Sequence, residues 1–286
     1  DVYGIIDNAQ QSWSNIVING NDPVTINIYE NGQINSNTTG FTSRVIINNE
    51  GLFHFTNEGT ISNQGNFTFN NLPTGRCIAP STFNFLLNPG AVFNHQGILE
   101  LANLENSEGT LHITTQSQMK VSRNFNNHGT FLVDAGADFQ LPCEPLPGSA
   151  GTTICSFRVG DKGVGQQFIN NSECFEVNGA VNFEGVTTTN GIMRITNGDF
   201  DIHKAASGTG GHITVVNGVS TIHGSGSYAG TDLTFCDEDT AGNDFDNIFS
   251  SNSSNMYTID CSIESACGVV CPSITCKPVT IRIRKM

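Results

Sequence analysis

Short stretches in which apolar and polar residues alternate recur along the chain, and most follow an Asn-Gly or Asn-x-Gly turn. Clear examples are Leu52–Phe55, Phe67–Phe69 and Leu111–Ile113. Alternation places Leu, Ile and Phe on one face of a β-strand and Thr, His or Asn on the other. Asn and Gly suit the turns because both adopt a positive φ at low cost. The pattern therefore predicts many short, half-buried strands joined by tight corners.

The spacing of the corner glycines indicates how these strands are arranged. The intervals are 19 or 20 residues within three series: Gly32 and Gly51; Gly90, Gly109 and Gly129; Gly179, Gly198 and Gly218. The interval of 39 residues between Gly51 and Gly90 fits two coils of the same length, and the period breaks between Gly129 and Gly179. Such a period is typical of a solenoid coil.

We therefore expect an all-β chain that forms a single right-handed β-helix, a β-solenoid with coils of about 20 residues. Equivalent Asn and Phe positions should stack into ladders inside the solenoid and at its corners, and the 19 Phe residues are the natural interior. A β-sandwich of short strands is the alternative, because the shorter steps between Gly51, Gly59 and Gly65 also permit it.

Three segments depart from the repeat. Residues 1–17 lack an Asn-Gly corner and should cap the solenoid, which we expect to span residues 18–235. Residues 140–175, rich in Pro and Gly, are expected to leave the solenoid wall as a disulfide-stapled excursion. Residues 236–286 are expected to form a small Cys-rich C-terminal module that ends in a terminal strand.

Cysteine content indicates the compartment. Nine cysteines without matched metal-binding knuckles favour disulfides, hence an oxidising environment and a secreted, extracellular or cell-surface location. The odd number means that at least one thiol is free, buried or paired between chains. Cys143 and Cys155 are a candidate local pair, although spacing leaves the connectivity open. The disulfide candidates are Cys143, Cys155, Cys261, Cys267, Cys271 and Cys276.

Composition agrees with this location. Only 13% of the residues are charged, against about 25% in typical globular proteins, and strong helix formers are scarce, so almost no helix is expected. Apolar runs of about 18 residues are absent from the sequence, which excludes a helical membrane span. The first residue, Asp1, fits a processed mature form that has lost a signal peptide.

Charge is distributed unevenly along the chain. Residues 277–286 carry four basic and no acidic residues, whereas residues 1–276 carry 26 acidic and 8 basic ones. The end of the chain also alternates as an amphipathic strand, with Val279, Ile281 and Ile283 on one face and Arg282 and Arg284 on the other. Such a strand could be donated to another subunit in head-to-tail self-association, or it could pair within its own chain.

Enzymatic chemistry is the alternative from another class. Right-handed β-helices include polysaccharide lyases and glycoside hydrolases, which need clustered carboxylates with a base or a carboxylate pair across a groove. The candidate groups are Asp199, Asp201, His203 and Lys204, and Asp134 with Asp138. Each also fits ordinary solvated strand polarity, and we do not expect an enzyme.

Metal and nucleic-acid sites have weaker support. Asp237, Asp239, Asp244 and Asp246 could supply oxygen ligands for Ca²⁺, but the run lacks an EF-hand pattern and also fits a charged loop. The histidines show no zinc-binding spacing, and no other cofactor is expected. A net charge of −14 argues against a nucleic-acid partner.

Repeats such as Asn49–Phe53 and the tail segment Cys271–Arg282 resemble long secreted β-helix adhesins and surface-fibre proteins of Bacteroidota-type bacteria. The resemblance covers roughly 200 residues of repeat together with the tail. It implies an extracellular structural or adhesive protein, a fibre subunit with a glycan or another surface ligand as partner. Asp239-Thr240-Ala241 also resembles the O-glycosylation sequon of that group, which makes Thr240 a candidate glycosylation site, although an ordinary loop triplet is the alternative.

Overall fold

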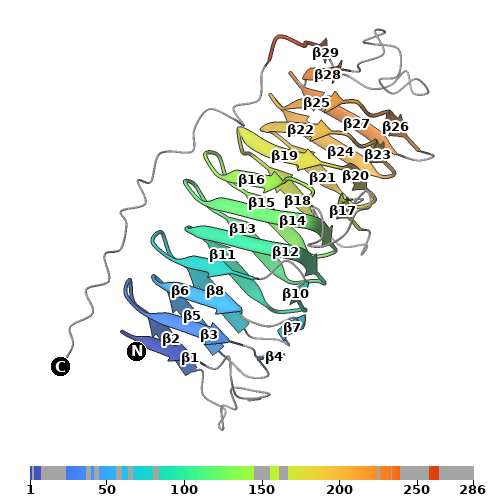
Figure 1. Cartoon of the computed structure of the whole chain (residues 1–286). Helices are drawn as coiled ribbons and strands as arrows, with labels where there is room; N and C mark the ends of the chain where they lie inside the picture. The colour runs from blue at the N-terminus through green and yellow to red at the C-terminus, as the bar shows by residue number, and fades with distance from the viewer. Residues whose placement is uncertain are drawn as a thin grey trace, which may run out of the picture.

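The computed structural model is all-β: its described residues form strands and no helix. They are residues 1, 3–7, 24–36, 40–41, 45–55, 60–63, 67–79, 84–144, 155–160, 167–223, 226–232, 234–238 and 258–263. Strand pairs within these ranges are parallel, and the strands stack along one axis from the N-terminal end to β29 (Figure 1). The predicted β-solenoid is therefore confirmed.

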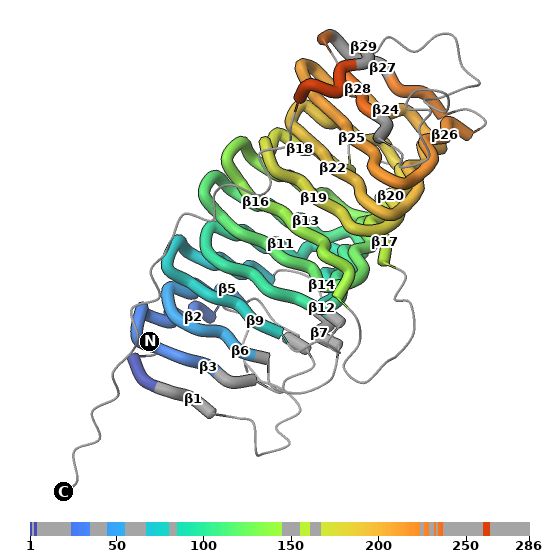
Figure 2. Tube along the Cα trace, turned by 45° about the horizontal axis from the view of Figure 1, so that its top comes forward, coloured from blue at the N-terminus to red at the C-terminus, as the bar shows by residue number. Residues whose placement is uncertain are grey.

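Each coil passes through three columns of strands, which we call faces A, B and C, in that order. Face A is a separate sheet made of β2 (Val24–Ile28), β5 (Val45–Asn49), β8 (Phe67–Asn71), β11 (Val92–His95), β13 (Thr110–Ile113), β15 (Thr130–Val133), β18 (Phe168–Asn170), β21 (Thr187–Thr189), β24 (Ala205–Thr209) and β27 (Ser227–Thr231). Faces B and C belong to one larger sheet because β12 (Ile98–Asn106) and β14 (Gln118–Asn127) run continuously through both (Figure 2).

The remaining strands of this larger sheet divide between the two faces. Face B holds the first halves of β12 and β14 together with β1 (Ile5–Asp7), β3 (Gln33–Ser36), β6 (Leu52–Phe55), β9 (Arg76–Ile78), β16 (Asp138–Leu141), β19 (Cys174–Asn178), β22 (Ile192–Thr196), β25 (His212–Val216), β28 (Thr234–Glu238) and β29 (Thr258–Ile259). Face C holds their second halves together with β4 (Gly40–Phe41), β7 (Thr60–Asn63), β10 (Asn84–Leu87), β17 (Ser156–Val159), β20 (Ala180–Phe183), β23 (Phe200–Ile202) and β26 (Ser220–Ile222).

Coil length follows from the register of face A. Paired residues one coil apart are 21 positions apart at Val24 and Val45, 20 at Thr110 and Thr130, and 19 at Phe168 and Thr187. The predicted coil of about 20 residues is thus confirmed. One coil is longer, because Phe131 pairs with Phe168, 37 residues later. Within the predicted excursion of residues 140–175, β17 and β18 nevertheless return to faces C and A, so only parts of that segment leave the repeat.

The three glycine series belong to three different corners of the coil. The first lies between faces A and B, the second between C and A, and the third between B and C. Gly51 and Gly90 therefore occupy different corners, and reading the interval between them as two coils was wrong. Gly97 is the position two coils after Gly51, because Gly75 stacks on the Gly51 turn and Gly97 on the Gly75 turn.

Close approach of backbones explains most of these glycines, whereas Gly90 and Gly179 also take a positive φ, of 80° and 150°. A Cβ on Gly97 would lie 2.1 Å from the Gly75 carbonyl oxygen, and one on Gly218 would lie 2.0 Å from that of Gly198. In the later Asn-Gly corners it is Asn197 and Asn217 that take a positive φ, of 56° and 57°. At these two corners the Asn thus takes the turn conformation and the Gly allows the close approach.

Phenylalanine fills the interior, as predicted. Rings stack between successive coils, with centroids 4.8 Å apart for Phe69 and Phe93 and 4.2 Å apart for Phe139 and Phe175. These pairs are in register, so each ring continues a ladder along the axis. The buried apolar cluster runs without interruption from Ile28 to Phe235. Burial of apolar surface along the whole rod is the main stabilising contribution.

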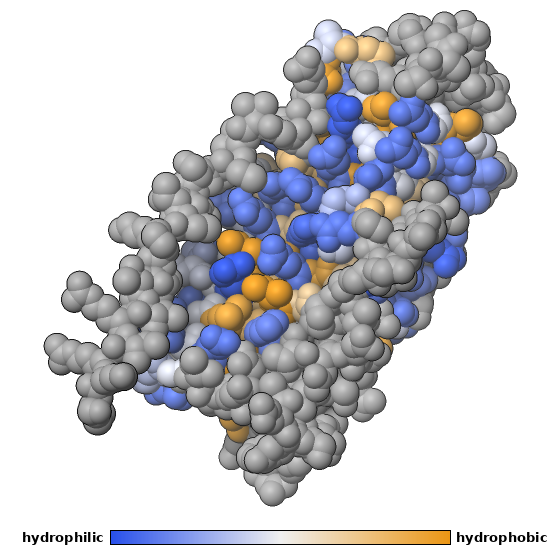
Figure 3. All heavy atoms as spheres, viewed as in Figure 1, coloured by the Kyte–Doolittle hydropathy of each residue, from blue (hydrophilic) through white to orange (hydrophobic). Residues whose placement is uncertain are grey.

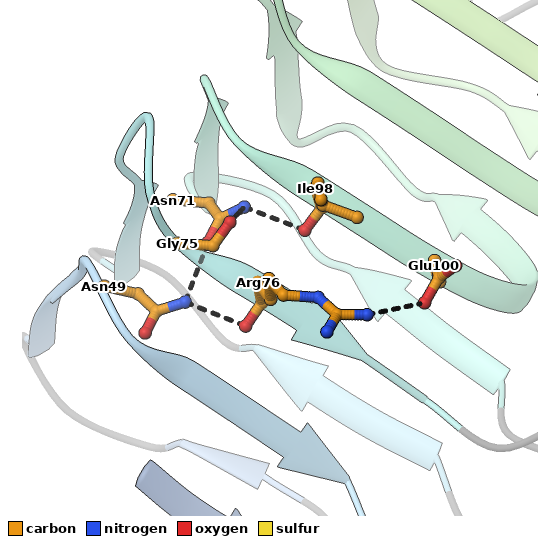
Figure 4. A network of polar contacts seen from close by, with 6 residues as sticks. All are labelled: Asn49, Asn71, Gly75, Arg76, Ile98 and Glu100. Atoms are coloured by element: carbon orange, nitrogen blue, oxygen red, sulfur yellow. Dashed lines mark hydrogen bonds and ion pairs between the residues drawn. The ribbon is translucent and has the colours of Figure 1, made fainter. Parts of the chain in front are cut away.

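A buried polar ladder follows the corner between faces A and B, also as predicted for Asn (Figure 4). Asn49 Nδ2 donates to Asn71 Oδ1 at 2.7 Å and to the Arg76 carbonyl at 3.0 Å. Asn71 Nδ2 donates to the Ile98 carbonyl at 3.0 Å and lies 3.1 Å from His95 Nδ1. The Nδ2 groups of these amides therefore bind carbonyl groups of the first residues of β9 and β12, just past the corner, and so find acceptors in the buried interior.

The ends of the described solenoid fall inside the two segments that were expected to differ from it. Ile5 in β1 pairs in register with Gln33 in β3, so the sheet begins within residues 1–17. At the other end β28 and β29 continue face B beyond residue 236. Helices long and apolar enough to cross a membrane do not occur in the described part of the chain.

Candidate functional site

Two disulfides join described cysteines. Cys143 pairs with Cys155, as predicted, with Cα atoms 5.5 Å apart, and links the end of β16 to the start of β17 at the corner between faces B and C. Cys261 pairs with Cys236 of β28, a partner that was not among the candidates. Cys267, Cys271 and Cys276 lie outside the described residues. Disulfides form and persist in oxidising compartments.

The odd number of cysteines allows a free, buried thiol, and the described residues include one. Cys77 in β9 is a free thiol with no exposed surface, and its burial raises its pKa well above the ordinary value. Because the thiolate is the reactive form, this burial makes Cys77 inert in the folded protein.

The predicted assembly strand, Val279, Ile281, Arg282, Ile283 and Arg284, lies outside the described residues. The same holds for Thr240 and for Asp239, Asp244 and Asp246 of the calcium candidate. Asp237 lies in β28, which pairs with β25 and β29. Across the described ranges, no three His, Cys, Asp or Glu residues form a group able to hold a metal ion.

The acidic candidates near residue 200 have separate roles. Asp199 Oδ1 accepts a hydrogen bond from the Val219 backbone N–H at 3.0 Å at the corner between faces B and C. Asp201 Oδ1 lies 2.8 Å from His223 Nε2, and the His203 ring stacks on the His223 ring with centroids 4.4 Å apart. Within this candidate group, Asp201 therefore contacts His223, a residue that the group did not include. His223 lies one coil after His203, and the 20-residue period could have identified it.

Asp134 and Asp138 also have different partners. Asp134 Oδ2 is 2.9 Å from His112 Nε2, a residue of β13 on face A. Asp138 is the first residue of β16 on face B, where it lines a cavity of about 120 Å³ with Glu100 and Lys120. Partial burial raises the pKa of Asp138. Asp138 therefore does not pair with Asp134, and its carboxylate instead accepts a hydrogen bond from Gln140 Nε2 and lies 3.1 Å from Cys174 Sγ.

A larger cavity of about 460 Å³ lies on face C. It is lined by Phe85, Leu86, Asn103, Leu104, Glu105, Arg123, Asn124 and Asn126. The register explains its position. The offset between β12 and β14 is 20 residues up to Leu101 but 21 from Asn103 onward, so β14 carries one extra residue at this corner. Such bulges redirect side chains and are enriched beside functional sites.

Arg123 is next to this register shift and was missed in the sequence. Its side chain is only 9% exposed, and Nη2 has no hydrogen-bond partner. Arginine is rarely buried without a partner. The sequence did contain a signal, because Arg123 follows Val121 and precedes Phe125 at positions that alternation assigns to the interior.

No family model matches the chain, and the comparisons with curated proteins and with solved structures found no match.

Proposed function

We propose that this chain is an extracellular structural or adhesive protein, a rod that assembles head-to-tail into a fibre through its C-terminal strand. The observation that carries the proposal is the way successive coils bind each other. Every described coil joins the next through parallel, in-register strands. The strand edge at one end of the rod is therefore of the kind that pairs with the strand edge at the other end. Such heterologous contacts extend into filaments when they do not close into a ring.

The N-terminal end has the features that a donated strand needs. Within the described residues, β1 pairs only with β3 and β2 only with β5, so each has one edge to which no described strand is bonded. Exposed strand edges are templates for strand addition. Asp1 and Glu30 are exposed at this end and carry the charge opposite to that of Arg282 and Arg284. Charge would steer the encounter, and alternate apolar side chains would supply affinity.

The surface is compatible with a passive rod. On the face that Figure 3 shows, the described residues are mostly hydrophilic, with smaller apolar groups near the middle and the upper end of the rod. Disulfides and a solenoid body suit a protein that must persist outside the cell.

Deletion of residues 279–286 tests the proposal. The full chain should show a mass by light scattering that rises with concentration and filaments by electron microscopy, and the deletion should remain monomeric. The double variant Arg282→Glu/Arg284→Glu should weaken assembly, Arg282→Lys/Arg284→Lys should preserve it, and adding Glu30→Lys to the Glu variant should partly restore it. Unchanged assembly after the deletion would contradict the proposal.

A second function rests on the small cavity on face B. Asp138, whose pKa is raised by burial, lines this cavity together with Glu100 and Lys120, which also pair with Arg76 and Glu144 respectively. Carboxylates with a nearby base are the groups that glycan cleavage uses. Incubation with acidic and neutral polysaccharides tests it. Depolymerisation that is lost in Asp138→Asn and kept in Asp134→Asn would establish an enzyme of the polysaccharide lyase or glycoside hydrolase class. Intact polysaccharides would dismiss this alternative.

A further inference from the structure

We propose that the cavity on face C binds an acidic sugar, a hydroxylated ligand with one carboxylate, and that Arg123 receives this carboxylate. The inference is independent of fibre assembly, because the cavity lies at mid-rod on β10, β12 and β14. Its volume of about 460 Å³ is within the range of small-molecule sites.

Arg123 differs from the other arginines in the described part of the chain. Those are each at least one third exposed, and each pairs with a glutamate: Arg76 with Glu100, Arg158 with Glu184 and Arg194 with Glu176. Arg123 is nine-tenths buried, has an unpartnered Nη2, and forms no ion pair with any described carboxylate. A buried charge without a partner is strongly destabilising, whereas an anion in the cavity would neutralise it.

The shape of the guanidinium selects a carboxylate. Its planar array of N–H donors matches two carboxylate oxygens, and such charge-assisted pairs are among the stronger hydrogen bonds. Glu105 lines the same cavity and is exposed. Its negative charge disfavours ligands that carry several charges, so a singly charged ligand fits better than a polyvalent anion.

The remaining polar groups suit hydroxyls. Asn103, Asn124 and Asn126 line the cavity. Asn124 Nδ2 donates to Asn103 Oδ1 at 3.4 Å, and the remaining amide groups offer both donors and acceptors. Asn124 is held in place because its Oδ1 accepts the Ser156 backbone N–H at 3.1 Å. Glu105 adds an acceptor for hydroxyl groups. Phe85 is only 3% exposed and offers no stacking platform, so recognition would depend on hydrogen bonds.

Calorimetric titration of the full chain with glucuronate, glucose and glutarate tests the inference. Glucuronate should bind at least about tenfold more tightly than glucose, because only it pairs with the guanidinium. It should also bind more tightly than glutarate, which has carboxylates but no hydroxyls. Arg123→Met should remove the preference for glucuronate over glucose, and Arg194→Met on face B, a matched loss of one positive charge, should leave it unchanged.

A second variant keeps the inference testable if Arg123→Met fails to fold. Asn126→Asp places a negative charge in the cavity and should weaken glucuronate binding about tenfold or more while leaving thermal unfolding and any glucose binding unchanged. Equal binding of glucuronate and glucose, tighter binding of glutarate or sulfate, or no binding of glucuronate would each overturn the inference. Tighter binding of an acidic peptide would overturn the assignment to sugars.

Discussion

His95 is a titratable side chain in the middle of the buried ladder of Asn49 and Asn71. Its Nε2 lies 2.8 Å from the Gln118 carbonyl and its Nδ1 lies 3.1 Å from Asn71 Nδ2. A neutral ring with the proton on Nε2 satisfies both contacts, because Nε2 then donates and Nδ1 accepts. A second proton on Nδ1 would face the Asn71 donor, and burial lowers the pKa of His95 to about 4.

This lowered pKa predicts a loss of stability in acid. An unfolded chain binds the proton near pH 6.5, whereas the folded state resists it down to about pH 4, so the contribution is complete above pH 6.5 and lost as pH falls toward 4. The loss should reach about 2–3 kcal/mol by pH 4.5. Urea denaturation at pH 7.5 and 4.5 would measure it. In His95→Asn the difference between the two pH values should shrink by about that amount, and an unchanged difference would argue against this role for His95.

Asn71 belongs to the buried ladder, and its neighbour Asn70 belongs to a second ladder of asparagines on the outer surface. The two residues therefore allow the contributions of the two ladders to stability to be compared. Asn71 is fully buried with four polar contacts, whereas Asn70 points outward between Asn48 and Asn94. Asn71→Ala should lower the free energy of unfolding by about 3 kcal/mol or more, because buried carbonyls and the Asn49 amide lose their partner. Asn70→Ala should cost about 1 kcal/mol or less. Urea midpoints would show the difference, and equal effects would refute the distinction.

At the scale of the element, the corner glycines set how closely two coils can approach. Gly97→Ala would place Cβ 2.1 Å from the Gly75 carbonyl oxygen and 2.6 Å from that of Leu72. Backbone atoms cannot move aside as a flexible side chain would, so we expect a loss of about 2 kcal/mol or more in stability. Gly4→Ala is the matched control, since no atom lies within 4 Å of its added Cβ. Similar melting temperatures for the two variants would contradict this explanation of the motif.

At the scale of the whole molecule, local stability against opening should vary along the rod. Each coil contacts only its neighbours, so a central coil gains two interfaces and an end coil gains one. Amide hydrogen exchange of the chain lacking residues 279–286 should be slowest in β13, β14 and β15 and fastest in β2 and β27. Mass spectrometry of peptides would measure this gradient. Uniform protection along the axis would instead indicate that the rod opens as one unit.

Much of this architecture could be predicted from local sequence. Alternation identified half-buried strands such as Leu52–Phe55, since the period of two is a property of the strand itself. Glycine spacing predicted the coil length, and two nearby cysteines predicted the bond between Cys143 and Cys155. These features depend on residues close together in the chain or on a simple repeat.

Tertiary structure decided the features that depend on how successive coils stack. Three corners share one period, so the sequence alone could not assign Gly51 and Gly90 to different corners. Cys236 and Cys261 meet because β29 stacks on β28, and His223 reaches Asp201 from the next coil. The register shift beside Arg123 is one residue in length, too small to show in a period of about 20. The sequence by itself thus determined the repeating coil, and only the stacking of coils decided which side chains meet.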